Sequence, residues 1–132
     1  MKIPQTILSV AFVILVVLLF TSPRHRVPMY DASDEVTLQG TVQDVQEFYC
    51  PISGRVGTHL MVKTENGNIQ VHVAPAGFLS DHNFSFRRGD SVQVVGSRVI
   101  FQGHGAVIAR AVTLKGQTIA FREANGHPLW AN

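Results

Sequence analysis

Residues 59–74 read HLMVKTENGNIQVHVA, a segment in which two runs of alternating apolar and polar residues flank an Asn-Gly pair. Asn-Gly favours a two-residue turn between antiparallel strands, because both residues readily take positive φ angles. With Asn66 and Gly67 as the loop, the apolar side chains share one face of the hairpin, which we expect to be buried. The inward pairs are then Leu60 with Val73 and Val62 with Val71. The outward pairs are Lys63 with Gln70, Met61 with His72 and His59 with Ala74.

Short segments rich in β-branched residues continue on both sides of this hairpin, and helical periodicity is not sustained anywhere after residue 34. We expect further strands over residues 35–48, 91–101, 106–114 and 117–122, with bulges near Gly40 and at Gly96, and a short helix over residues 75–83. Three strands, a short helix and two strands are the order of a five-stranded OB-type barrel, with a split β-sandwich as the alternative. The sequence therefore predicts an all-β domain over residues 35–123 and a tail over residues 124–132.

The outer face of strands 2 and 3 is where OB folds commonly bind ligands. On the expected register this face carries Lys63 and Gln70 as candidate ligand-binding residues, beside three candidate metal ligands. Those three are His59, Met61 and His72, and Cys50 joins them from the loop before the second strand. A thiolate, a thioether and two imidazoles form a soft ligand set that favours copper, and histidine with Met or Cys also holds haem iron.

The same four residues have a structural interpretation. His59 and His72 are then solvated strand residues, Met61 packs across His72, and Cys50 is a small, partly buried apolar residue. Their spacing matches no established metal-binding motif, so the proposed convergence depends on the strand register alone. Because Cys50 is the single cysteine, it cannot form an internal disulfide.

Two other classes of function fit the sequence less well. An oriented nucleophile and base, paired carboxylates and a phosphate-binding loop are all missing from the sequence pattern, so we expect no enzymatic activity. Eight of the eleven Lys and Arg and all nine Asp and Glu lie in residues 31–132, which leaves this part with a net charge of −1. A protein that grips a phosphate backbone is expected to carry an excess of Lys and Arg. Single-stranded nucleic-acid binding therefore stays the alternative function, with nucleic acid an improbable partner.

The N-terminal segment predicts a membrane anchor. Residues 6–22 contain no charged residue and are just long enough to span a bilayer as a helix. A cleaved signal peptide, the main alternative, usually has a shorter apolar run and an A-x-A-like cleavage site, which Thr21, Ser22 and Pro23 do not supply. We therefore assign residues 1–22 to a single transmembrane helix and residues 23–34, which are polar and contain prolines, to a linker.

Two further segments carry a family resemblance. RGDSVQVVG over residues 88–96 and AVIARAV over residues 106–112 resemble the last two strands of bacterial membrane-anchored periplasmic OB-fold proteins, which are mostly uncharacterised. With Gly40 and residues 69–75, the resemblance covers most of residues 35–122. The layout of anchor plus barrel is more distantly similar to the haem chaperone of cytochrome c maturation. That chaperone binds haem through an H-x-x-x-Y pattern after the barrel, whereas His127 is followed by no tyrosine here, so no haem-binding residue carries over.

The resemblance implies a single-pass protein of the bacterial inner membrane whose domain faces the periplasm. We expect an extracytoplasmic binding or assembly module that presents the face of strands 2 and 3 to a protein partner in the cell envelope or to a small ligand. Copper or haem is the cofactor that the candidate metal ligands favour.

Overall fold

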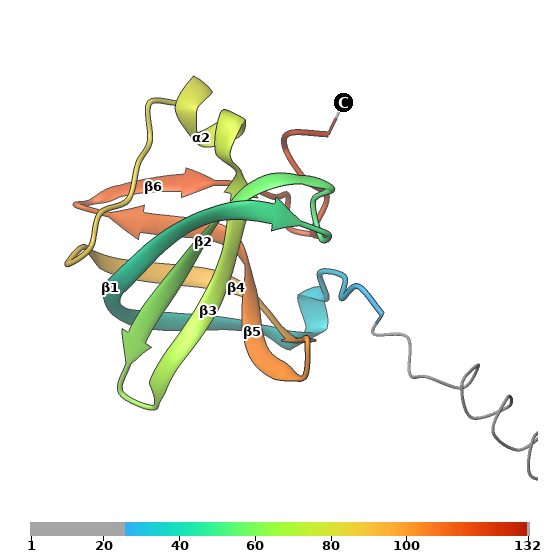
Figure 1. Ribbon diagram of the computed structural model, residues 1–132, viewed down its shortest axis with the longest axis horizontal. Helices are drawn as coiled ribbons and strands as arrows, with labels where there is room; N and C mark the ends of the chain where they lie inside the picture. Colours follow the sequence, from blue (N-terminus) through green and yellow to red (C-terminus); the bar gives the residue numbers. More distant parts are fainter. Residues whose placement is uncertain (1–25, 132) are drawn as a thin grey trace, which may run out of the picture.

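The computed structural model describes residues 26–131, so the predicted anchor over residues 1–22 lies outside the described part of the chain. Within residues 26–131, neither helix has the length and apolar character needed to cross a membrane. The elements, shown in Figure 1, are a 3-10 helix η1 (Ala32–Asp34), strands β1 (Glu35–Cys50), β2 (Arg55–Thr64) and β3 (Gly67–Pro75), helix α2 (Ala76–Asp81), and strands β4 (Ser91–Phe101), β5 (His104–Leu114) and β6 (Gln117–Ala120).

The predicted all-β class with a short helix after the third strand is confirmed, and the sheet has the order β3-β2-β1-β4-β5-β6. The first part of β1 pairs with β4 and the later part with β2, so this one strand bends from one neighbour to the other. β3 also pairs with β5 in parallel, and the pairings of β1 to β5 therefore form a closed cycle. The sixth strand, β6, lies beside β5 and is shorter than the predicted strand over residues 117–122.

The predicted inward face of the hairpin is correct, but its register is wrong by two residues. The loop is Glu65-Asn66, because Thr64 pairs with Gly67, whose φ is +110°. The Thr64 hydroxyl donates to the Gly67 carbonyl and accepts from the Asn66 amide, which closes the turn one residue earlier than predicted. A shift of two residues keeps each side chain on its face of the strand. Met61 consequently pairs with Gln70 instead of His72.

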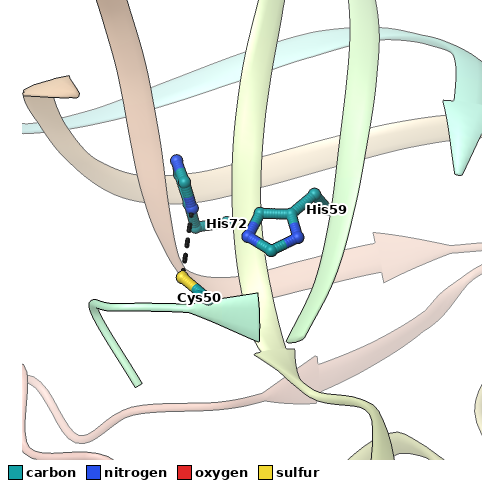
Figure 2. Close-up of side chains that lie close together, drawn as sticks. All are labelled: Cys50, His59 and His72. Atoms are coloured by element: carbon teal, nitrogen blue, oxygen red, sulfur yellow. Dashed lines mark hydrogen bonds between the residues drawn. The ribbon is translucent and has the colours of Figure 1, made fainter. Parts of the chain in front are cut away.

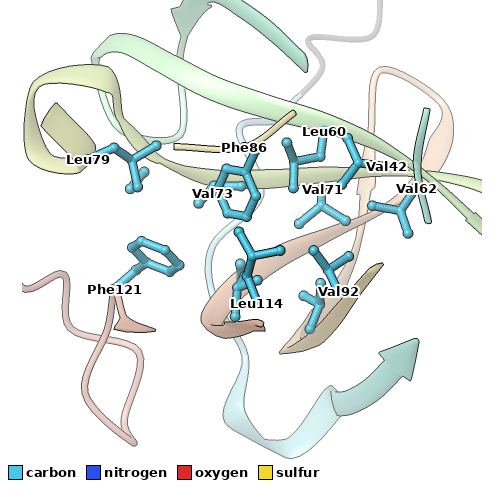
Figure 3. Packing of buried hydrophobic residues seen from close by; sticks show 14 of the residues in the cluster. Val42, Leu60, Val62, Val71, Val73, Leu79, Phe86, Val92, Leu114 and Phe121 are labelled. Carbon is cyan, nitrogen blue, oxygen red and sulfur yellow. The ribbon is translucent and has the colours of Figure 1, made fainter. Parts of the chain in front are cut away.

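The core fills the space enclosed by the paired strands. Figure 3 shows side chains from the hairpin, β4, β5 and the segment after β6 packed against one another. Leu60, Val62, Val71 and Val73, the four residues predicted to face inward, are at most 2% exposed. Burying such side chains is worth about 1.5–3 kcal/mol each, so this cluster supplies much of the stability of the domain.

The bend in β1 depends on Gly40. A register shift between Val42 and Asp44 follows it, close to the predicted bulge. A Cβ atom at Gly40 would collide with the Lys63 carbonyl oxygen and lie 2.7 Å from Cγ1 of Val62. Close approach of two backbones therefore requires glycine at this position.

Gly40→Ala is expected to lower the free energy of unfolding by about 1–3 kcal/mol, because β1 and β2 must separate to admit the methyl group. Urea unfolding followed by circular dichroism measures this loss. Gly77→Ala in α2 is the matched control, since a Cβ there meets no atom within 4 Å. Equal stability of the two variants would show that β1 and β2 do not approach as closely as described.

Candidate metal centre

Three of the four predicted metal ligands come together inside the domain. Cys50 is the last residue of β1, His59 lies in β2 and His72 in β3, and Figure 2 shows their side chains directed toward one another. One ligand atom from each residue lies within 4.8 Å of the others. The Cys50 Sγ atom is 3.5 Å from Nδ1 of His72. Atoms at such distances can move by about an ångström or less to reach bonding distance of one metal ion.

The register of the hairpin produces this arrangement. The turn at Glu65-Asn66 places His59 directly opposite His72, whereas the predicted turn would place it opposite Ala74, and a bulge between Thr58 and His59 shifts only the pairs beyond His59. Gly57 supplies the space: a Cβ atom there would lie 3.2 Å from Cβ of Cys50 and 3.4 Å from Cε1 of His59. A side chain at Gly57 would therefore press on two of the three candidate ligands.

The three side chains of the cluster are almost fully buried. Cys50, His59 and His72 are 3%, 2% and 3% exposed. The ring of Phe48 stacks on His59 with centroids 3.7 Å apart, and Phe101 meets His72 edge-on at 4.6 Å. The interpretation of His59 and His72 as solvated strand residues is therefore wrong, because two aromatic rings cover them.

The imidazole nitrogens lack the partners that buried polar atoms normally have. Neither nitrogen of His59 has a hydrogen-bond partner among the described residues, and Nε2 of His72 also lacks one. A buried polar atom without a partner costs about 1–3 kcal/mol, so native proteins rarely leave several in one place. Bonding to a metal ion would satisfy one nitrogen of each ring through its lone pair.

Both histidines are held in the form that binds metals. Burial lowers the pKa of His59 to about 4. Burial, and then repulsion from a charged His59, lower the pKa of His72 to about 4. At neutral pH both imidazoles are therefore uncharged, so a metal ion has no histidine protons to displace.

A small cavity of about 10 Å³ adjoins the three ligands. This is about the volume that one water molecule or one metal ion needs, and far less than a porphyrin requires. The residues that line it are Cys50, Ile52, Ser53, Gly57, Thr58, His59, His72, Val73, Ala74, Arg122 and Trp130.

The other predicted site residues lie elsewhere. Met61 and Gln70 pair with each other and line a separate hollow of about 240 Å³. Lys63 is exposed and borders another hollow, of about 660 Å³, beside the first part of β1. The predicted ligand-binding pair Lys63 and Gln70 therefore does not share one hollow, and Met61 does not line the cavity beside Cys50, His59 and His72.

Arg122 is the residue of this site that sequence reasoning missed. It follows β6, is 7% exposed and borders the cavity from the side of the C-terminal tail. The tail folds back through a bridge between Arg122 and Pro128 and a hydrogen bond from the Leu129 amide to the Phe121 carbonyl. Nothing in the local sequence marks a buried arginine here, because its burial depends on this return of the tail.

Comparisons with known proteins identify one family, and two distant structures are among those that are similar. The MamS/MamX magnetosome protein family matches residues 34–119, well over half of the chain. No curated protein matches the sequence. The S. pombe Stn1-Ten1 complex is similar with a TM-score of 0.48 at 16% identity, over 63% of this chain and 59% of that chain. Rim1, a mitochondrial single-stranded DNA binding protein of S. cerevisiae, is similar with a TM-score of 0.46 at 9% identity, over 66% of this chain and 96% of that chain. The family match covers nearly all of β1 to β6, and the chain belongs to the MamS/MamX magnetosome protein family.

Proposed function

We propose that this chain is an OB-type barrel module that holds one copper(I) ion between Cys50, His59 and His72. One observation carries the proposal: three buried ligand atoms from three adjacent strands lie within 4.8 Å of one another, and three imidazole nitrogens there have no partner among the described residues. A single metal ion bound at this point would satisfy one nitrogen of each ring.

The ligand set favours copper over the other candidates. Two imidazoles and one thiolate in a trigonal arrangement are the set that copper electron-transfer proteins use, and thiolate selects soft ions. Structural zinc sites take four protein ligands, and a fourth is missing from the cluster among residues 26–131. Haem does not fit, because a cavity of about 10 Å³ cannot admit the macrocycle.

The same proposal extends to the location of the module in the cell and to its binding partner. The uncharged residues 6–22 support a single-pass anchor in the bacterial inner membrane, with the domain on the periplasmic side. A protein partner in the cell envelope binds the part of β2 and β3 that carries the exposed Lys63 and the half-buried Gln70. Binding and delivery require no turnover, so the module is not an enzyme. A net charge of −1 over residues 31–132 argues against the nucleic-acid alternative.

Titration of the full chain in detergent with copper(I), under anaerobic conditions and against a chromogenic copper(I) chelator, tests the site. We expect one ion per chain. Cys50→Ser and His72→Gln should each weaken binding more than about 100-fold, beyond what the loss of a supporting residue causes. Both variants are checked for folding by circular dichroism before titration.

Met61→Leu and His104→Gln are the matched controls, because Met61 does not line the cavity beside the three ligands and His104 is exposed at the start of β5. Both should bind copper(I) as the wild type does. If Cys50→Ser retains wild-type affinity, or if Met61→Leu loses as much as His72→Gln, the proposed ligand set is wrong.

A further inference from the structure

The cavity beside the three ligands contains a buried positive charge. Arg122 borders the cavity with 7% of its surface exposed. Its Nη1 donates a hydrogen bond of 3.0 Å to the Gly126 carbonyl, and its Nε has no partner among the described residues. None of the ion pairs within residues 26–131 includes Arg122. A buried guanidinium normally has a carboxylate partner, so its position here needs another explanation.

Aromatic rings hold the guanidinium in place of a carboxylate. The Cζ atom of Arg122 lies 4.9 Å from the centroid of the Trp130 ring and 5.8 Å from that of Tyr30. Ring faces attract a cation without neutralising its charge. The cavity therefore keeps a full positive charge next to the ligands.

The charge acts on Cys50 in particular. Arg122 and Cys50 line the same cavity of about 10 Å³, so the guanidinium and the sulfur lie near each other. The pKa of Tyr30 is raised to about 12, first by burial, so its hydroxyl is neutral at pH 7.

This charge distinguishes ions by their valence. When Cu⁺ replaces the thiol proton of Cys50, one positive charge enters and one leaves, and the charge of the cavity does not change. When a divalent ion replaces the same proton, the cavity gains one positive charge beside Arg122. If the sulfur is already a thiolate, each ion adds one charge more, and the difference between them is still one unit. The field of Arg122 therefore opposes divalent ions by one more unit charge than Cu⁺.

We propose that Arg122 is a specificity-determining residue that makes the Cys50–His59–His72 site select monovalent copper over divalent ions. This inference rests on the proposed copper site. Arg122 does not bind the metal in this proposal; it acts through the electrostatic potential at the cavity. Trp130 and Tyr30 contribute by keeping the guanidinium charged in a buried position.

The test compares the affinities of the full chain for Cu⁺ and Zn²⁺ in the wild type, Arg122→Gln and Arg122→Lys. Both variants lose the guanidinium packing and its geometry, but only Arg122→Gln loses the charge. We expect Arg122→Gln to lower the ratio of Cu⁺ to Zn²⁺ affinity on the order of tenfold, chiefly by improving Zn²⁺ binding. Arg122→Lys should retain most of the wild-type ratio, and thermal unfolding shows whether each variant is folded.

The outcomes separate this inference from the copper site itself. If the wild type binds Cu⁺ at Cys50 but Arg122→Gln has the same affinity ratio, the site stands and the role of Arg122 is overturned. If Arg122→Gln and Arg122→Lys change the ratio equally, charge is not the cause and the inference also fails. If the wild type binds neither ion, the proposed function fails and the inference with it.

Discussion

Without metal, the protein is expected to lose about 2 kcal/mol of its free energy of unfolding for each of His59 and His72 when the pH falls from 7 to 5. The pKa of each histidine in the folded chain is about 4, chiefly because of burial, against an ordinary value of 6.5. Together the two account for a loss of roughly 4 kcal/mol, a large part of the stability of a small domain.

The direction of this pH effect follows from whether the folded or the unfolded chain binds the protons. Above pH 6.5 the imidazoles are neutral in both the folded and the unfolded chain, and their contribution is constant. Between pH 6.5 and 4 the unfolded chain binds protons that the folded chain does not, so the unfolded state gains stability as the pH falls. Below about pH 4 both states are protonated, and the loss from these two groups is complete.

Urea unfolding of the metal-free protein at pH 7, 6 and 5, in the presence of a chelator, measures this loss. His72→Gln should reduce the pH dependence by about half, because one buried imidazole remains. His104→Gln, which removes an exposed imidazole, should retain the wild-type dependence. If His72→Gln and the wild type have the same pH dependence, His72 is not held neutral by burial.

Much of the fold could be predicted because strand signals are local. β4 has the predicted bounds, and its register shift at Gly96 is where the glycine indicated a bulge. The prediction of the inward face of the hairpin is correct despite an error of two residues in register, because side chains alternate with a period of two. The turn was harder to place, since the Thr64 hydroxyl bonds determine it and Asn-Gly alone does not.

The site could be predicted in part only, because its geometry is set by distant contacts. The sequence placed Cys50, His59 and His72 together with Met61, whereas in the structure Met61 pairs with Gln70 and does not line the cavity beside the other three. Two features were not predictable from local patterns: the turn at Glu65-Asn66 that sets His59 opposite His72, and the rings of Phe48 and Phe101 that bury them. Of these features, burial has the largest effect on the chemistry of the site, because it keeps both histidines uncharged at neutral pH.

The tail shows how the core supports the site. Phe121 is fully buried, and its backbone accepts a hydrogen bond from the Leu129 amide and donates one to the Arg110 carbonyl. Its ring meets those of Phe78 and Phe84 edge-on. Phe121 therefore joins the core to the tail that carries Trp130 and positions Arg122.

Phe121→Ala is expected to lower the free energy of unfolding by about 3–5 kcal/mol, because the ring leaves a cavity that the strands around it cannot close. Urea unfolding followed by the fluorescence of Trp130, the single tryptophan, measures both the stability and the environment of the tail. Ile100→Ala is the matched control: this side chain is 67% exposed, and its loss should change stability by no more than about 0.5 kcal/mol. Native-state emission of Trp130 should shift to longer wavelength in Phe121→Ala, since the tail loses its attachment to the core. If stability falls while the emission of Trp130 is unchanged, the tail is held by contacts other than those of Phe121.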